Sequence, residues 1–350
     1  MAWNIGISLT NQCNLNCNHC SVDSGKKLSD EISTEKWMQI INQLNDITVQ
    51  SIVFSGGEPL LKENFKEIIK KTDKFCPSIS IETNGTLLHH YFDVFSNIEN
   101  LKNIAISLDG LTSNTYAKLR NSDDITTVLN NISFAIKKLK CNIEVITVLT
   151  KYNVDEIPDI YDFTSKIGVE LRILSHIGCG GRGSNSQDQN LDPIAIYEFA
   201  KSFVFPKMKS EINNLKKRPN IHISLPLPFI PFELPPYNMA CKLRNMFAIL
   251  PNGDVAFCYR CTNVKPLVFG SLRENSLKEI YGKTGFNVDF INTDQIYYEG
   301  VCSKCIAFKT CHGSCVLDSY WETGHFTSSY SFCQKMFEQG EFPPWALFDN

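Results

Sequence analysis

Cysteine is the residue type most able to do chemistry in this sequence. Eleven of the fourteen cysteines fall into two groups: Cys13, Cys17 and Cys20, and eight more between Cys241 and Cys333. The N-terminus, MAWNIGISLT, lacks the basic start and long apolar run of a signal peptide. We therefore expect a cytoplasmic protein with reduced thiols rather than disulfides. Metal ligation and catalysis are the functions that so many thiols indicate.

The first group occupies one segment, CNLNCNHC, over residues 13–20. Three thiolates this close together can wrap around an iron–sulfur cluster, whose usual ligands are cysteines. A zinc site prefers four ligands and paired C-x-x-C arms. His19 would be the fourth zinc ligand, but it is wedged between two cysteines. We favour a cluster in which one iron has no protein ligand.

Short apolar runs alternate with amphipathic segments over the first 175 residues, as expected for parallel strands joined by helices. Their near-continuous apolar character predicts strands buried on both faces. Six such units predict a partial (βα)6 barrel similar to a TIM barrel, with an open doubly wound sheet as the alternative. The predicted strands are 3–10, 51–55, 78–83, 103–109, 143–150 and 170–175.

Small and polar residues follow these predicted strands: the three-cysteine segment, then SGGEP, TNG, DG, KYN and HIGCGGRG. Barrel enzymes keep their active sites at the C-terminal ends of their strands. Tight turns alone require glycine and asparagine, which explains one or two of these loops. Turn chemistry explains neither the cysteines nor Glu58 of the second loop.

The character of the sequence changes after residue 190. Residues 193–218 are predicted to form a helix ending in KKR, a basic run that we interpret as a solvated face rather than a site for an acidic segment. Residues 225–236 are rich in proline and predict an extended linker. We divide the chain into a barrel (1–220), a linker (221–240), a small cysteine-rich domain (241–335) and a C-terminal tail (336–350).

The C-x3-C-x2-C motif after a first strand, followed by GGEP after the second, resembles the radical S-adenosylmethionine (SAM) superfamily. This resemblance implies a 4Fe–4S cluster on Cys13, Cys17 and Cys20 whose open iron is chelated by SAM. It also implies reductive cleavage of SAM to a 5′-deoxyadenosyl radical, which abstracts a hydrogen atom from a substrate. The role of the protein is to bind and orient the cofactor and the substrate and to exclude water.

The resemblance also implies contacts to SAM at the ends of the strands. Four residues after the second strand resemble the segment that holds the methionine amino group. Ser107 and Arg120 resemble polar contacts to the methionine carboxylate, which the fork of an arginine matches. Asn84 and Asp109 are candidates for the ribose side, although Asp109 is equally explained as a turn residue. The segment for the amino group is Ser55, Gly56, Gly57 and Glu58.

The C-terminal cysteines resemble the seven-cysteine SPASM domain, which extends many radical SAM enzymes that modify peptides. The resemblance implies two auxiliary 4Fe–4S clusters, and hence three clusters in all. Cys261 is our choice for the missing fourth ligand of one cluster; otherwise that cluster has an open iron. A zinc ribbon is the alternative. The first set of ligands is Cys302, Cys305, Cys311 and Cys333; the second is Cys241, Cys258 and Cys315.

Three cysteines lie outside both groups. Cys76 and Cys141 are interpreted as small core residues, the usual role of a free cysteine. Cys179 lies in the glycine-rich loop after the sixth predicted strand. A turn residue is one interpretation of Cys179, and a catalytic hydrogen-atom donor or a cluster ligand is the other.

The resemblance implies an oxidoreductase that matures a ribosomally made peptide through a carbon–carbon or thioether cross-link. The alternatives are a peptide epimerase using Cys179, a sulfatase-maturing enzyme, an enzyme acting on a small molecule such as a tetrapyrrole, and an electron carrier. Sulfatase-maturing enzymes have an aspartate where this sequence has Tyr259. An electron carrier has no use for SGGEP and Arg120.

The expected partners are a precursor peptide, a separate leader-binding protein, and a flavodoxin or ferredoxin as electron donor. We expect neither nucleic acid nor membrane as a partner. The net charge is −3, and the sequence has no apolar run of about 18 residues. Only 12 residues precede Cys13, so we expect no leader-binding domain at the N-terminus.

Overall fold

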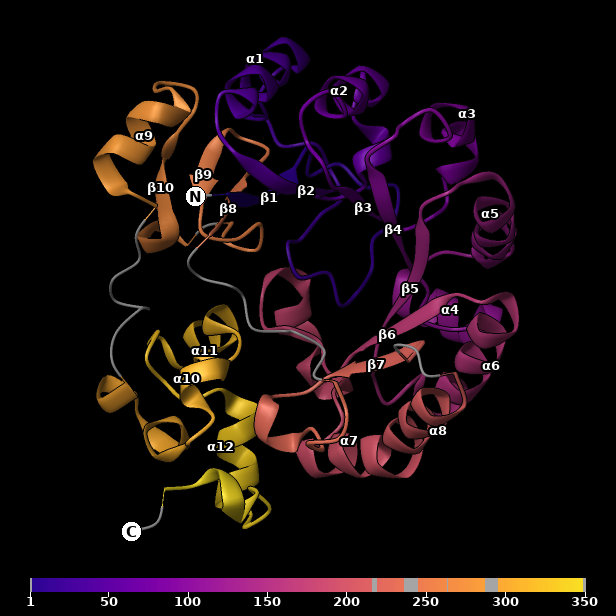
Figure 1. The fold of residues 1–350 in the computed structure, drawn as a ribbon, viewed down its shortest axis with the longest axis vertical. Coiled ribbons are helices and arrows are strands. Elements are labelled where there is room, and N and C mark those ends of the chain that lie inside the picture. The colour runs from indigo at the N-terminus through magenta and orange to yellow at the C-terminus, as the bar shows by residue number, and fades with distance from the viewer. Residues whose placement is uncertain (1, 216–218, 236–244, 263, 287–294, 349–350) are drawn as a thin grey trace.

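The computed structural model describes residues 2–215, 219–235, 245–262, 264–286 and 295–348, and it contains one curved ten-stranded sheet (Figure 1). The six predicted strands are confirmed, and each pairs in parallel with the next along the chain. These strands are β1 (Trp3–Ser8), β2 (Val49–Ser55), β3 (Ile79–Thr83), β4 (Leu101–Ser107), β5 (Asn142–Val148) and β6 (Glu170–Leu174). The partial parallel barrel predicted from the sequence is therefore present.

Four further strands extend the sheet at both edges. β7 (Ile221–Ser224) pairs in parallel with β6, so the first four residues of the predicted linker belong to the sheet. β8 (Met246–Ile249) pairs in parallel with β1, and β9 (Asp254–Ala256) and β10 (Val268–Ser271) follow in antiparallel pairing. The sheet thus continues beyond the linker, whose residues 236–240 lie outside the described residues.

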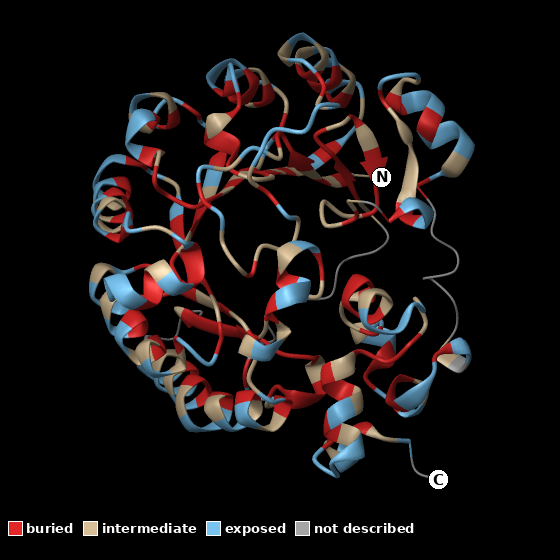
Figure 2. Cartoon of the chain, turned by 180° about the vertical axis from the view of Figure 1, so that it is seen from behind, coloured by how far each residue is buried: buried red, intermediate tan, exposed pale blue. Residues whose placement is uncertain are grey.

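Helices cover the convex side of the sheet, with their inner faces buried (Figures 1 and 2). The predicted helix over 193–218 is observed in its described part as α7 (Pro193–Phe199), a π-helical turn at 200–204 and α8 (Phe205–Leu215). Its basic KKR end, residues 216–218, lies outside the described residues. The helices along the barrel are α1 (Thr34–Asn45), α2 (Phe65–Thr72), α3 (Phe92–Phe95), α4 (Ser113–Arg120), α5 (Ile125–Lys138), α6 (Ile157–Ile167), α7 (Pro193–Phe199) and α8 (Phe205–Leu215).

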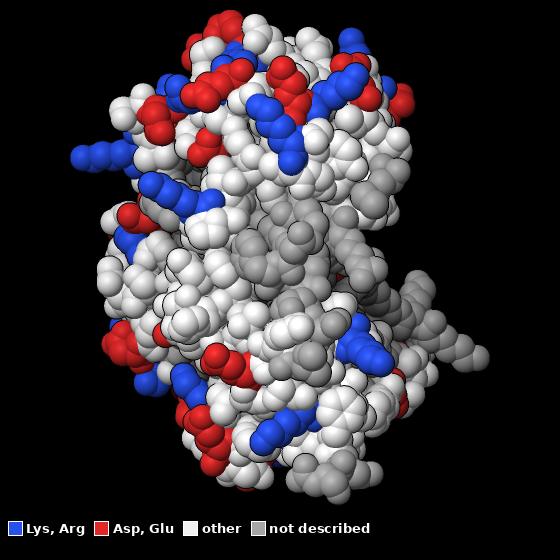
Figure 3. All heavy atoms as spheres, turned by 90° about the vertical axis from the view of Figure 1, so that its left-hand side faces the viewer, with Lys and Arg blue, Asp and Glu red and all other residues white. Residues whose placement is uncertain are grey.

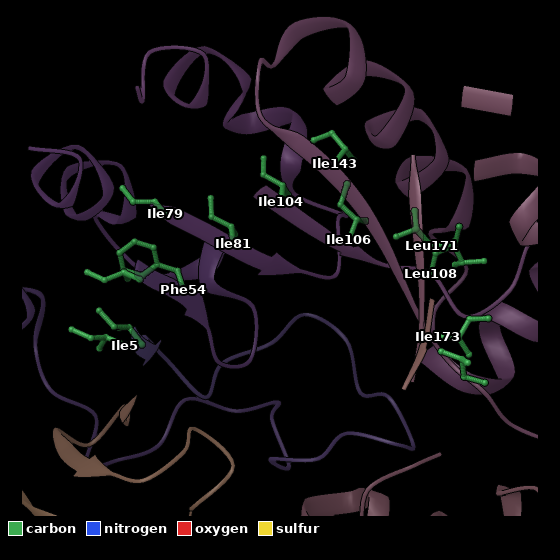
Figure 4. Packing of buried hydrophobic residues seen from close by; sticks show 14 of the residues in the cluster. Ile5, Phe54, Ile79, Ile81, Ile104, Ile106, Leu108, Ile143, Leu171 and Ile173 are labelled. Atoms are coloured by element: carbon green, nitrogen blue, oxygen red, sulfur yellow. The ribbon is translucent and has the colours of Figure 1, made fainter. Parts of the chain in front are cut away.

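The core lies between these helices and the convex face of the sheet. Ile5, Phe54, Ile81 and Ile106 point from the strands toward the helices and are fully or almost fully buried (Figure 4). The alternate strand residues face the concave side, and many are polar. For example, Arg172 on β6 pairs with Glu144 on β5 at 3.0 Å. The concave face is therefore a polar interior, in which Glu144 is itself buried.

The C-terminal segment lies between the two edges of the sheet (Figure 1). Phe229 after β7 packs against Phe332 and Phe342 with ring centroids 5.1 and 5.5 Å apart. These apolar contacts pack the C-terminal segment against the chain that follows β7. The helices of this segment are α10 (Phe308–Cys311), α11 (Val316–Thr323) and α12 (Ser331–Glu338), whereas α9 (Leu277–Thr284) packs beside β10 and α1.

Charged side chains of both signs are interspersed on the face shown in Figure 3. This mixture agrees with the small net charge of −3. In the described part of the chain, every helix is too short or too polar to cross a bilayer.

Candidate functional site

The three N-terminal cysteines lie on a loop between β1 and α1 that other residues hold closed. Glu31 accepts hydrogen bonds from Thr10 Oγ1 at 2.9 Å and from the Asn11 amide at 2.8 Å. The Cys13 amide donates to the Gly25 carbonyl at 2.8 Å. Hydrogen bonds that do not involve the thiols therefore help to close this loop, on which all three thiols are partly exposed.

Each of these thiols has an N–H donor nearby. The amides of Leu15 and Ser24 lie 3.5 and 3.4 Å from the sulfurs of Cys13 and Cys20. Arg120 Nη1 lies 3.9 Å from Cys17 Sγ. Such donors stabilise thiolate sulfur and tune an iron–sulfur cluster. The residues present therefore fit a cluster with thiolate ligands.

Burial sets the protonation of these thiols when no metal is bound. It raises the pKa of Cys13 to about 11, because desolvation disfavours the thiolate. The thiol therefore keeps its proton at neutral pH, and metal binding must displace it. In the described residues, no three His, Cys, Asp or Glu side chains are grouped tightly enough to hold a single metal ion.

The glycines after β2 dock this strand end onto the cysteine loop. A Cβ on Gly57 would lie 2.3 Å from the carbonyl oxygen of Gln12, and Gly56 has φ of +132°. The amides of Gly57 and Glu58 donate to the carbonyls of Thr10 and Gln12 at 2.8 and 2.9 Å. Only glycine permits this approach, so the GGEP segment and the thiols are held as one unit.

Glu58 joins the ends of β2 and β3. Its fully buried carboxylate accepts hydrogen bonds from Thr83 Oγ1 at 2.8 Å and from the amides of Asn84 and Leu60 at 2.8 and 3.1 Å. Burial raises the pKa of Glu58 to about 7, although these donors favour the charged form. The side chain of Asn84 lies 3.8 Å from Cys13 Sγ. The TNG turn after β3 thereby lies beside the thiols.

The raised pKa of Glu58 predicts a pH-dependent stability. Between its ordinary value of 4.5 and about 7, the folded chain binds more protons than the unfolded chain, so the free energy of unfolding falls as pH rises. The loss is expected to reach on the order of 3 kcal/mol. Glu58→Gln should flatten this dependence in urea unfolding measured at pH 5 and pH 7. Equal slopes for the variant and the wild type would contradict the assignment.

Arg120, Asp109 and His19 form a buried cluster beside Cys17. Arg120 Nε lies 2.6 Å and His19 Nε2 lies 3.1 Å from Asp109 Oδ2. Burial raises the pKa of Asp109, but the Arg120 guanidinium outweighs it and holds the pKa well below its usual range. The carboxylate is fully buried and engaged by these partners, which is the geometry of a residue that positions Arg120 rather than one that faces a ribose. Ser107 is half-buried at the end of β4.

Four C-terminal thiols line a single cavity with apolar walls that include Phe308 and Phe342. Burial raises the pKa of Cys311 to about 11 and raises that of Cys333 well above its usual range. The four thiols, which match the ligand set predicted for one auxiliary cluster, are Cys302, Cys305, Cys311 and Cys333.

Three other predicted ligands, Cys258, Cys261 and Cys315, lie in a second apolar cluster of residues. Cys261 is fully buried, and its amide donates to the Cys258 carbonyl at 3.0 Å. The structure therefore places Cys261 in the same cluster of residues as Cys258 and Cys315, the ligands that it was predicted to join as a fourth ligand. Cys241 lies outside the described residues.

The two core cysteines are placed away from these groups. Cys76 is buried and donates to the Ser78 carbonyl at 3.2 Å. Cys141 is half-buried and packs against the main core.

The loop after β6 connects the cysteine loop to the C-terminal part, a role that sequence reasoning missed. Arg182 Nε donates to the Cys17 carbonyl at 3.0 Å, and the Gly183 amide donates to the Cys20 carbonyl at 3.1 Å. At the other end, the Cys179 amide donates to Asp318 Oδ1 on α11 at 3.4 Å. The available signal was the arginine within the glycine-rich HIGCGGRG segment.

Cys179 faces α11 from this loop. Its sulfur lies 3.4 Å from Glu322 Oε1 and 3.6 Å from Gln187 Oε1. Burial and the nearby carboxylates of Glu322 and Asp318 raise the pKa of Cys179 to about 12. The side chain is therefore a neutral thiol at physiological pH.

Family models match both the barrel with its three N-terminal cysteines and the cysteine-rich C-terminal part. The model of the radical SAM superfamily matches residues 7–164, and the SPASM model, described as an iron–sulfur cluster-binding domain, matches residues 241–306. The chain therefore contains a radical SAM domain followed by a SPASM domain. A 4Fe–4S cluster and SAM are the cofactors of this superfamily, and the SPASM domain binds further iron–sulfur clusters.

Two curated relatives illustrate the range of similar proteins. A GTP 3′,8-cyclase of Synechocystis sp. is 30% identical over 50% of this chain and 54% of its own length. The mycofactocin maturase MftC of Mycobacterium ulcerans is 23% identical over 89% of this chain and 82% of its own. The chain thus spans about half the length of the cyclase but most of the maturase.

Two solved structures share the fold over nearly the whole chain. Streptococcus suis SuiB bound to its precursor peptide SuiA has a TM-score of 0.74 and 15% identity, covering 95% of this chain and 76% of SuiB. The protein anSMEcpe with bound AdoMet has a TM-score of 0.71 and 19% identity, covering 97% of this chain and 96% of its own.

Proposed function

We propose that this protein is a radical SAM maturase that cross-links a ribosomally made peptide through a carbon–carbon or thioether bond. The observation that carries the proposal is the loop after β6, which connects two parts of the chain. Its Arg182 contacts Cys17 on the loop of the three N-terminal cysteines, and its Cys179 contacts Asp318 in the cysteine-rich C-terminal part, called the SPASM part below. Forming a cross-link removes two hydrogens from the peptide. Such a reaction needs electron-handling groups beside the catalytic cluster.

Similar proteins support a peptide as the substrate. SuiB was solved with a precursor peptide, and anSMEcpe has been solved with bound peptides. MftC, a maturase, matches most of this chain. We propose the same substrate class here, together with a leader-binding protein and a flavodoxin or ferredoxin as electron donor.

The proposed cofactor set is three 4Fe–4S clusters and SAM. When bound, SAM and the catalytic cluster supply the radical that removes a hydrogen atom from the substrate. Arg120, held by Asp109, and Ser107 would bind the methionine carboxylate, and the segment from Ser55 to Glu58 would bind the amino group. The proposed ligands are Cys13, Cys17 and Cys20; then Cys302, Cys305, Cys311 and Cys333; then Cys241, Cys258, Cys261 and Cys315.

A peptide epimerase is the second candidate, and the neutral thiol of Cys179 is the observation that favours it. An epimerase must return a hydrogen atom to the substrate radical, and a protonated thiol can donate one. A cross-linking enzyme needs no such donor. The two functions therefore predict different products and different roles for Cys179.

Cys179→Ala separates these functions in reactions run with the precursor peptide in D2O. For a cross-linking enzyme, we expect wild type and variant to give a product lighter by two hydrogens and without deuterium at the modified carbon. Mass spectrometry of the peptide measures both. A wild-type product of unchanged composition with one deuterium at that carbon, lost in the variant, would establish the epimerase instead.

A further inference from the structure

Arg260 and Asp318 form a buried ion pair in the SPASM part, between the barrel and the second group of C-terminal thiols. Arg260 Nη2 lies 2.8 Å from Asp318 Oδ1, and their side chains are only 17% and 6% exposed. Burying two charges is costly, and a buried pair is often no more stable than an apolar replacement. Stability alone therefore does not explain why this ion pair lies among predicted cluster ligands, and we look for a functional reason.

The guanidinium faces sulfur as well as carboxylate. Arg260 Nη1 lies 3.5 Å from Cys315 Sγ. Arg260 also lies in sequence between Cys258 and Cys261, and an arginine guanidinium keeps its proton in proteins. Arg260 is therefore a permanent cation directed at these thiols.

The surrounding residues fix the guanidinium in this position. It lies over the ring of Trp321, 5.0 Å from its centroid. A Cβ on Gly178 would lie 2.1 Å from Arg260 Nη2, so the glycine of the β6 loop leaves the space that the guanidinium fills. Asp318 is held in turn by the Cys179 amide at 3.4 Å and by His176 Nε2 at 3.6 Å.

We propose that Arg260 raises the reduction potential of the auxiliary cluster at Cys258, Cys261 and Cys315, and that Asp318 limits this increase. The inference rests on the proposed function, which places a cluster at these thiols. Both are positioning residues, because they act through the electrostatic environment of the cluster.

The physical reason is the charge on the cluster. Reduction adds one negative charge, so a fixed cation with an N–H directed at a ligand sulfur stabilises the reduced form. Net charge and hydrogen bonds to the sulfurs are known to set such potentials. The Asp318 carboxylate partly cancels the Arg260 charge at short range. The pair therefore predicts shifts of opposite sign when each member is neutralised.

The test is an anaerobic redox titration of the reconstituted full-length protein, monitored by electron paramagnetic resonance. Arg260→Gln should move the potential of this cluster to more negative values, and Asp318→Asn should move it to more positive values. Arg260→Lys keeps the charge and should restore part of the wild-type potential. Lys265→Gln is the matched control, because this exposed lysine carries the same charge four residues after Cys261, and we expect no shift.

The direction of the two shifts decides the proposal. Shifts of the same sign, or an unchanged potential in Asp318→Asn, would overturn it; a purely structural pair predicts no opposed shifts. If the Arg260→Gln protein does not assemble its clusters, the potentials measured for Asp318→Asn and Arg260→Lys are sufficient to test the proposal. The potential of the catalytic cluster serves as the internal reference.

The same measurements separate this proposal from the proposed function. The titration uses neither SAM nor peptide, so failure to cross-link a peptide leaves the opposed shifts intact. Unchanged iron content after Cys258→Ala and Cys315→Ala would show that no cluster lies there and would overturn the proposal.

Discussion

Replacing Cys13, Cys17 and Cys20 by alanine is expected to abolish cleavage of SAM to 5′-deoxyadenosine. The wild type should bind about 12 irons per chain after anaerobic reconstitution, and the triple variant about eight, because each 4Fe–4S cluster depends on its thiolates. Iron analysis and chromatography of 5′-deoxyadenosine measure these two effects. The fold should persist, since Glu31 and the Cys13 amide close the loop without using the thiols.

The matched control removes two thiols that lie outside the predicted ligand sets. The double variant Cys76→Ala and Cys141→Ala changes core positions, so it should retain about 12 irons and produce 5′-deoxyadenosine. Production of 5′-deoxyadenosine by the triple variant would rule out the catalytic assignment of the N-terminal cysteines.

The second large effect is expected at the buried pair of Arg120 and Asp109. Removing one partner of a buried ion pair leaves an uncompensated charge, which typically costs roughly 3–5 kcal/mol. Arg120→Ala and Asp109→Asn should therefore each lower the free energy of unfolding by about this amount. Urea unfolding of the purified proteins measures the loss.

A double-mutant cycle shows whether the two residues act as a unit. The variant carrying both changes should lose clearly less stability than the sum of the single losses, because residues in contact are not additive. Additive losses would show that the 2.6 Å contact contributes little.

The same two variants test the proposed role in binding SAM. Arg120→Ala should weaken SAM binding by about 1.5–3 kcal/mol, the range for a hydrogen bond to a charged group, while iron content stays at the wild-type level. Asp109→Asn keeps the guanidinium but releases it, so we expect a smaller loss. If calorimetry shows the same affinity for SAM in the wild type and in both variants, the role of these two residues is purely structural.

Local patterns in the sequence were enough to predict the barrel, its six strands and the order of the loops that follow them. Strand and helix periodicity, turn residues and cysteine spacing are properties of short segments, so they can be interpreted without knowing what lies opposite. The spacing of Cys13, Cys17 and Cys20 and of the C-terminal thiols likewise indicated two separate groups. The radical SAM model covers the first group, and the SPASM model covers the second group as far as Cys305.

Partners far apart in the chain required the tertiary structure. Asp109 was equally a turn residue in the sequence, because nothing in its neighbourhood specifies Arg120 and His19 as its partners. The connection through the β6 loop joins Arg182 to Cys17 and Cys179 to Asp318, residues more than 130 positions apart. Strand register and the packing of the C-terminal helices between the sheet edges create these contacts, and a single sequence does not encode either in any local pattern.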